Sequence, residues 1–110
     1  MKISELAKLL EFEAVALPSP ESEVDGCYVG DLLSWVMGRA SEGNVWITIM
    51  TNINIVAVAS ISGVSAIAVA EGLDIPEDVI SAAKAQNVNI LRSKLPSFDT
   101  ALAVGRLISS

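Results

Sequence analysis

The sequence contains no histidine and only one cysteine, Cys27. Histidine is the commonest metal ligand and the usual general base of enzymes, so its absence argues against zinc centres, redox centres and catalytic triads. A single cysteine forms no internal disulfide and no cysteine-rich metal site, and we expect Cys27 to be a small buried apolar side chain. The sequence therefore indicates no metal and no cofactor.

Basic residues are also few. Seven Lys and Arg residues stand against thirteen Asp and Glu residues, which gives a net charge of −6, and the basic residues form no cluster in the sequence. Nucleic-acid binding depends on many cationic contacts with phosphates, so we expect no DNA or RNA partner. Charged residues make up 18% of the chain and aromatic residues 5%, whereas 52% are hydrophobic. Small aliphatic side chains must therefore build the core, and some apolar surface should remain for a protein partner.

The length of 110 residues is sufficient for one domain, residues 1–110, and leaves no room for a second. Residues 1–5 lead into an amphipathic helix pattern rather than into the apolar segment of a signal peptide. We therefore expect a cytoplasmic protein.

A long uncharged stretch raises the question of a membrane span. The 28 residues between Glu42 and Glu71 carry no charge, and a span needs only about 20 apolar residues. Asn52, Asn54 and Gly63 interrupt this stretch, however, and polar side chains are costly inside a bilayer. A buried parallel strand followed by a covered helix explains the same apolarity, so we expect no membrane association.

Apolar periodicity and turn residues predict alternating strands and helices along the whole chain. A first helix should begin after Ser4, its expected N-cap, and run to Leu10. The expected strands are residues 13–17, 26–29, 45–50, 65–70 and 88–91, and the expected later helices are residues 32–37, 53–61, 76–86 and 98–108. Strands that alternate with crossover helices indicate an α/β fold with parallel βαβ units.

In this order of elements, four stretches carry a resemblance to a known family. They are residues 1–7 (MKISELA), 28–34 (YVGDLLS), 46–60 and 75–92. The chain resembles the DRTGG domain family and the related N-terminal domain of bacterial HPr kinase/phosphorylase. The resemblance implies a three-layer α/β/α sandwich with a mostly parallel sheet, used as a dimer-forming or regulatory module.

Two departures from the family limit what the resemblance implies about activity. The Asp-Arg-Thr-Gly-Gly signature is absent, and residues 51–55 (TNINI) stand where it would be expected. The phosphate-binding loop of the kinase, G-x-x-x-x-G-K-[ST], is absent too, because the sequence has no Gly-Lys pair. We therefore expect no enzymatic activity, and a kinase label would describe ancestry.

The residues that follow the parallel strands are the candidate ligand-binding residues, because ligands bind beyond the carboxyl ends of such strands. Arg92 and Lys94 would place positive charge there, as a small anionic ligand requires. Structural roles remain open: Asp31, Thr51 and Asn52 are also typical helix caps, and the two basic residues could pair with Glu71. The candidates are Gly30, Asp31, Thr51, Asn52, Asn54, Glu71, Gly72, Arg92, Ser93 and Lys94.

The expected helix at residues 53–61 is apolar on nearly every side, and a small domain covers such a helix on only one side. We therefore expect a homodimer that packs this helix, or the helix at residues 32–37, against its symmetry mate. The favoured function is a non-catalytic regulatory or interaction domain that senses a small anionic ligand. The alternatives are a scaffold or accessory subunit of a redox (hydrogenase-type) complex, which the family resemblance implies, and a phosphotransferase-related enzyme.

Overall fold

A computed structural model describes residues 1–109 of the chain. Within these residues the fold contains five helices and five strands, and the strands form one sheet in the order β1-β5-β4-β3-β2. Strands β2 to β5 are parallel, and β1 pairs antiparallel with β5. In chain order the elements are α1 (Ile3–Leu10), β1 (Glu13–Ala16), β2 (Gly26–Val29), α2 (Leu33–Arg39), β3 (Asn44–Thr48), α3 (Asn54–Ser62), β4 (Ala66–Val69), α4 (Glu77–Ala85), β5 (Ile90–Arg92) and α5 (Ser97–Ser109).

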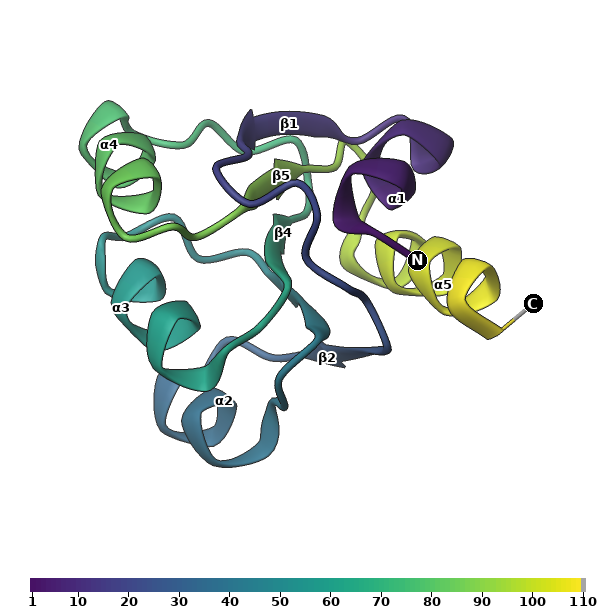
Figure 1. Ribbon diagram of the computed structural model, residues 1–110, viewed down its shortest axis with the longest axis horizontal. Coiled ribbons are helices and arrows are strands. Elements are labelled where there is room, and N and C mark those ends of the chain that lie inside the picture. Colours follow the sequence, from purple (N-terminus) through teal and green to yellow (C-terminus); the bar gives the residue numbers. More distant parts are fainter. Residues whose placement is uncertain (110) are drawn as a thin grey trace.

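The helices lie in two layers on opposite faces of the sheet. Helices α2, α3 and α4 cover one face, and α1 and α5 cover the other (Figure 1). The expected α/β fold, a three-layer α/β/α sandwich with a mostly parallel sheet, is therefore confirmed. Each predicted element is present, and the boundaries differ by a few residues at most.

Side chains along the central strands alternate between the two faces of the sheet and contribute to the hydrophobic core on each face. In β3, Trp46 faces the layer of α2 to α4, whereas Val45 and Ile47 face α1 and α5, and all three side chains are fully buried. In β4 the alanines face α1 and α5, and Ile67 and Val69 face the other layer. Successive side chains of a strand point to opposite faces, so a continuous apolar run indicates a strand that is covered on both sides.

The predicted start of the first helix was wrong. Helix α1 begins at Ile3, and Ser4 lies inside it rather than at its N-cap. The backbone N–H of Lys2 donates to Glu5 Oε1 at 3.1 Å, so a carboxylate caps this end of the helix. Ile3 is drawn into the first turn because its side chain is fully buried in the core beneath α1.

Helix α3 follows the uncharged strand β3, as the sequence predicts. Ile55, Val56, Val58 and Ala59 are buried, whereas Ile61 on the outer side is 71% exposed. Helices α2 and α4 flank α3 within its layer (Figure 1). No helix in residues 1–109 is both long enough and apolar enough to cross a membrane.

Candidate functional site

The carboxyl ends of β2, β3, β4 and β5 lie at one edge of the sheet, because these four strands are parallel. All the candidate residues predicted from the sequence therefore lie at this edge. They divide into two groups: one follows β2 and β3, and the other follows β4 and β5. Within residues 1–109 no hydrogen bond or ion pair joins the two groups.

In the first group, Asp31 does not cap a helix. Its Oδ1 atom accepts hydrogen bonds from Thr48 Oγ1 at 2.7 Å and from the backbone N–H of Ile49 at 3.0 Å. Helix α2 begins after Leu32 without a side-chain cap. The capping interpretation was wrong, because the carboxylate of Asp31 accepts a hydrogen bond from the buried Thr48 at the end of β3 instead. Asp31 thus joins the end of β2 to the end of β3.

Asn52 is the other polar junction of this group. Its Oδ1 atom accepts a hydrogen bond from the backbone N–H of Asn54 at 3.0 Å, which satisfies a free donor at the start of α3. Asn52 thus supports the start of α3, but the N-cap residue itself is Ile53, which has no side-chain cap hydrogen bond, so the expected N-cap position was wrong. Thr51 is half-buried and Asn54 is exposed, and the hydroxyl of Thr51 makes no hydrogen bond within residues 1–109.

In the second group, the segments after β4 and β5 hold each other through their backbones. Ser93 N–H donates to Val69 O, Gly72 N–H donates to Ser93 O, and Glu71 N–H donates to Leu95 O, each at 2.8 Å. Glu71 and Gly72 both have positive φ values, 69° and 63°. Such a conformation costs a non-glycine residue about 1–2 kcal/mol, so tertiary contacts must hold Glu71 in place.

One of those contacts is made by the side chain of Glu71. Its Oε2 atom accepts a hydrogen bond from the backbone N–H of Ser97 at 3.3 Å, at the first turn of α5. A carboxylate is favoured at this position by the partial positive charge of the helix N-terminus. Glu71 therefore stabilises the loop, and it does not pair with Arg92 or Lys94.

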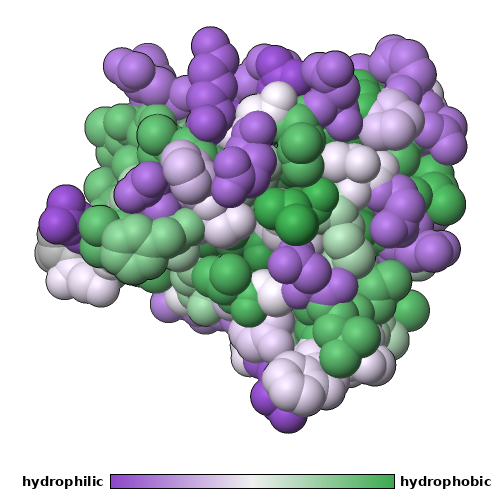
Figure 2. Space-filling view, turned by 180° about the vertical axis from the view of Figure 1, so that it is seen from behind, coloured by the Kyte–Doolittle hydropathy of each residue, from purple (hydrophilic) through white to green (hydrophobic). Residues whose placement is uncertain are grey.

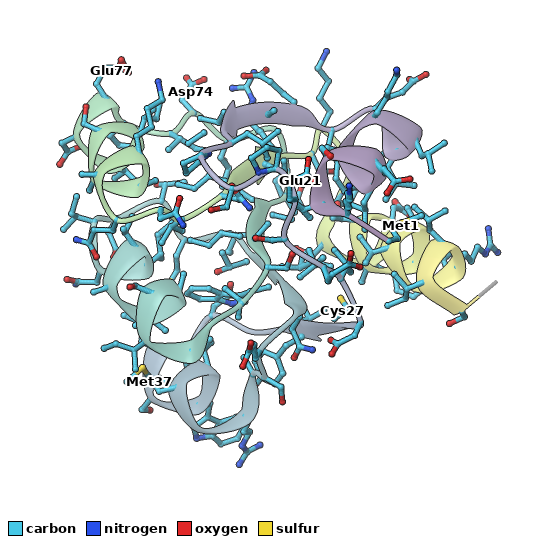
Figure 3. All side chains as sticks on the ribbon, in the orientation of Figure 1. Met1, Glu21, Cys27, Met37, Asp74 and Glu77 are labelled. Carbon is cyan, nitrogen blue, oxygen red and sulfur yellow. The ribbon has the colours of Figure 1, made fainter. Side chains whose placement is uncertain are left out.

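Arg92 pairs with two other carboxylates. Its NH2 atom lies 3.1 Å from Glu13 Oε1, and its NH1 atom lies 3.1 Å from Asp74 Oδ1. Glu13 is opposite Arg92 in the antiparallel pair of β1 and β5, and Asp74 lies in the loop before α4 (Figure 3). The suggested pairing with Glu71 was wrong. The Arg92 side chain is 24% exposed, and its guanidinium group has five N–H donors, so further donors remain for a ligand.

Arg92 also lines a hollow between α1, β1 and the segment that follows β5. Its volume is about 300 Å³, and its lining includes the three basic side chains Lys8, Arg92 and Lys94. A smaller hollow of about 200 Å³ shares Glu11, Phe12 and Lys94 with it. We call the two together the basic pocket. Its remaining lining residues are Ala7, Leu10, Glu11, Glu13, Ser93 and Leu95.

Basic side chains gather in the basic pocket, where Arg92 is paired with carboxylates and Lys8 and Lys94 form no ion pair in residues 1–109. Three of the seven Lys and Arg residues line it, together with two acidic side chains, although the whole chain carries a net charge of −6. Of the ten candidate residues predicted from the sequence, only Arg92, Ser93 and Lys94 line this pocket. The arrangement is suited chemically to holding a small anion.

Ser93 has a structural role beside the pocket. Its Oγ atom lies 2.8 Å from Thr100 Oγ1 and accepts a hydrogen bond from the backbone N–H of Leu95 at 3.1 Å. The Thr100 hydroxyl also donates to Leu95 O at 3.2 Å. Ser93 and Thr100 are both fully buried. This network fixes the turn that carries Lys94 between them.

Sequence reasoning missed the contributions of α1 and β1 to this site. Lys8 and Glu13 were not among the candidates, because these were chosen from the residues that follow the parallel strands. That choice leaves out the residues at the start of an antiparallel edge strand. Strand β1 starts at the edge where β5 ends, so it brings Glu13 beside Arg92. The sequence feature that could have indicated this contribution is Lys8, which lies in the last turn of the helix that immediately precedes this strand.

No group of three or more metal-ligating side chains lies in the part of the chain that the structure describes. No protein-family model matches the chain, and no curated protein matches it. Among solved structures, it is similar to the CBS and DRTGG domains of the regulatory region of Clostridium perfringens pyrophosphatase, complexed with the activator diadenosine tetraphosphate. The TM-score is 0.70 and the sequence identity is 20%. The chain has a DRTGG-like fold.

The match covers 96% of this chain and 45% of the pyrophosphatase chain. The chain thus spans less than half the length of that regulatory region. The shared fold supports the resemblance to the DRTGG family that the sequence suggests. It also means that the structurally similar protein is a regulatory part of an enzyme.

Proposed function

We propose that residues 1–110 form a single non-catalytic regulatory domain that binds a small phosphate-bearing anion in the basic pocket. The observation that carries the proposal is the gathering of Lys8, Arg92 and Lys94 around one hollow in an acidic chain. Cationic side chains make charge-assisted hydrogen bonds to phosphate oxygens, and these are about twice as strong as neutral ones. The activator of the structurally similar pyrophosphatase region is itself a polyphosphate, which supports this ligand class.

Three observations support different roles for the three basic residues in this proposal. Glu13 and Asp74 hold the guanidinium of Arg92 from two sides, which leaves it positioned before any ligand arrives. Lys94 is exposed, and its backbone is fixed by the buried hydroxyls of Ser93 and Thr100. Lys8 reaches the same hollow from the last turn of α1. The volume of about 300 Å³ accommodates a phosphate group with few additional atoms.

Thermal-shift measurements with inorganic phosphate, phosphosugars, acyl phosphates and nucleotides test this function. A ligand at 100 times its Kd stabilises the folded state by about 2.7 kcal/mol, which raises Tm clearly for a domain of this size. Lys94→Ala should abolish the rise. Lys84→Ala on α4 is the matched control, because it removes the same charge from a residue outside the pocket. No rise with any of these compounds would overturn the proposal.

A regulatory domain of this kind needs a surface that transmits its state, and we propose that α2 forms a homodimer interface. Helix α2 has one buried residue, Val36, whereas Trp35 is 52% and Met37 is 42% exposed. Figure 3 shows Met37 on the outer side of the helix. Apolar side chains also group on the face that Figure 2 shows, which is the back of the molecule in Figure 1. A second copy would cover Trp35, whose ring already stacks on Arg39 at 3.8 Å.

We prefer the ligand-binding module to a scaffold subunit of a redox complex, because a scaffold has no need of a cationic pocket. The phosphotransferase alternative lacks support for a different reason: the sequence has no phosphate-binding loop that would hold a nucleotide donor. A phosphate ligand of the basic pocket is therefore an effector rather than a substrate in this proposal.

A further inference from the structure

The two edges of the sheet are protected differently. At one edge, β1 carries Glu13, its pairing with β5 shifts register between Ala14 and Ala16, and the segment after it contains Pro18 and Pro20. Charges, bulges and prolines of this kind keep other strands from pairing with a sheet edge. At the other edge, β2 (GCYV) has no charge and no proline, and β3 is the only strand that pairs with it within residues 1–109. The edge formed by β2 therefore lacks these protections.

The backbone of β2 leaves hydrogen-bonding groups free along this edge. Gly30 N–H donates to Ile47 O at 3.2 Å, so the even-numbered residues of this segment direct their backbone groups towards β3. Backbone groups of successive strand residues point to opposite sides, so the N–H and C=O groups of Cys27 and Val29 point away from the sheet. Neither residue makes a backbone hydrogen bond to a loop or a helix within residues 1–109. The edge thus offers its outward donors and acceptors to an added strand.

Exposed apolar side chains lie at the carboxyl end of β2. Val29 is 50% exposed, Leu32 is 56% exposed and Ile49 is 45% exposed. Val29 is opposite Ile47 in the ladder, and the backbone N–H of Ile49 donates to Asp31, so the ends of β2 and β3 hold these side chains near one another. When an extended peptide is added to a sheet edge, backbone hydrogen bonds give affinity and contacts with alternate side chains give specificity. The edge of β2 offers both kinds of contact.

A carboxylate stands at each end of this edge. Asp25 immediately precedes β2 and Asp31 follows it, and both are exposed. Neither forms an ion pair within residues 1–109. A second copy of β2, paired antiparallel about Tyr28, would place Asp25 of each copy opposite Asp31 of the other, and like charges directly opposite are destabilising. A strand with a basic residue at each of these positions has the complementary charge instead.

We propose that the edge of β2 binds an extended segment of a partner protein as an added antiparallel strand, with apolar residues between two basic residues. Antiparallel pairing is slightly more stable than parallel pairing, and it forms hydrogen-bonded pairs with both Cys27 and Val29. Basic residues six positions apart lie opposite Asp25 and Asp31 in this register. The net charge of −6 favours the same kind of partner. The inference does not depend on the anion site in the basic pocket or on a dimer through α2.

An NMR titration of the ¹⁵N-labelled full chain with the capped peptide KTVTVTK tests the proposal. The third and fifth peptide residues lie opposite Val29 and Cys27 when the two lysines face the two carboxylates. We expect saturable binding that protects the amides of Cys27 and Val29 from hydrogen exchange. N-methylation of the third and fifth peptide residues should abolish binding, because their N–H groups face β2. N-methylation of the second and sixth residues removes only N–H groups that face solvent and should leave the affinity nearly unchanged.

Variants of the chain locate the binding surface. Val29→Pro removes an outward N–H donor and should abolish binding while the fold is kept, because proline is tolerated where the N–H of an edge strand faces solvent. Asp25→Asn should weaken binding severalfold through the loss of an ion pair. Glu77→Gln on α4 makes the same charge change away from this edge and should leave the affinity unchanged.

Four results would overturn the proposal. The first is the absence of saturable binding by the unmodified chain. The second is equal binding of the two methylated peptides, and the third is equally tight binding of ETVTVTE, which carries glutamates in place of the lysines. The fourth is protection of the Cys27 and Val29 amides that rises with protein concentration without any peptide, because a second copy of the chain would then cover the edge.

Discussion

Arg92 and Glu13, 79 residues apart in the sequence, form an ion pair of 3.1 Å that joins the antiparallel edge strand to the parallel sheet. The same guanidinium holds Asp74 at 3.1 Å. Each pair is partly exposed, and such pairs contribute roughly 0–1 kcal/mol. The two pairs together therefore matter more for the position of Arg92 than for the stability of the fold.

Replacing Arg92 by methionine should lower the free energy of unfolding only modestly, by about 1 kcal/mol, because two partly exposed ion pairs are lost. Urea denaturation measures this change. Arg106→Met near the end of α5 is the control, since no ion pair of Arg106 is present in residues 1–109. A loss of more than about 3 kcal/mol would show that the pairs behave as a buried charge network instead.

The hydrogen bonds of Thr48 predict that its replacement lowers the free energy of unfolding by more than the small size of the side chain suggests. Its hydroxyl donates to Asp31 and accepts from the backbone N–H of Met50 at 3.2 Å. Thr48→Val should therefore cost about 1–3 kcal/mol of stability, because it leaves a part-buried donor without a partner. Thr51→Val is the matched control and should cost less than about 0.5 kcal/mol, since the Thr51 hydroxyl makes no such bond. Equal losses in both variants would contradict this account.

Cys27 should react slowly with thiol reagents. It lies on β2 beside the core under α1 and α5 (Figure 3), and burial raises the pKa of its thiol to about 11 from 9.0. Only the thiolate is nucleophilic, so the rate of alkylation should be low at pH 8 and should rise about tenfold per pH unit until about pH 11. Cys27 is half-buried rather than fully buried as the sequence predicts. A rate that levels off near pH 9 would contradict the raised pKa of this thiol.

The raised pKa of the Cys27 thiol also makes the free energy of unfolding depend on pH. The folded state holds the Cys27 proton more tightly than the unfolded state, so its contribution is complete below about pH 9 and is lost as pH rises towards 11. Denaturation curves of the unmodified chain and of Cys27→Ala, measured between pH 8 and 11, isolate this contribution. The difference between the two proteins should shrink as the pH increases.

The proposed dimer predicts a clear change in mass. Trp35→Glu places a charge in the centre of the exposed apolar surface of α2 and should convert the dimer to a monomer in size-exclusion chromatography with light scattering. Leu9→Glu on α1 is the control, because Leu9 is 61% exposed but lies on the other layer. A stable monomer of the unmodified chain at micromolar concentration would end the dimer proposal.

Much of the fold could be predicted from the sequence because its signals are local. The apolar runs around Trp46 and Ile67, with Asn52, Asn54 and Gly63 between them, specify strands and a helix by local pattern. The ion pair between Arg92 and Glu13 could not be predicted in this way. Glu13 comes from a strand that joins the sheet antiparallel, and no local pattern specifies that choice.

The candidate residues predicted from the sequence lie at the carboxyl edge of the parallel strands, but only Arg92, Ser93 and Lys94 of them line the basic pocket. Arg92 and Lys94 follow directly from the rule for parallel strands, whereas Lys8 enters through the packing of α1 against the sheet. Asp31 shows the same limit: its partner Thr48 looks like an ordinary strand residue in the sequence, and only the tertiary structure brings the two side chains together.

An NMR titration of the ¹⁵N-labelled chain with inorganic phosphate tests the central claim most directly, because it reports every backbone amide at once. The account predicts saturable shifts concentrated in residues 8–13 and 92–95, and their loss in Lys94→Ala but not in Lys84→Ala. Shifts concentrated instead at Asp31 and at residues 51–54, or no saturable shift at all, would contradict a phosphate site in the basic pocket.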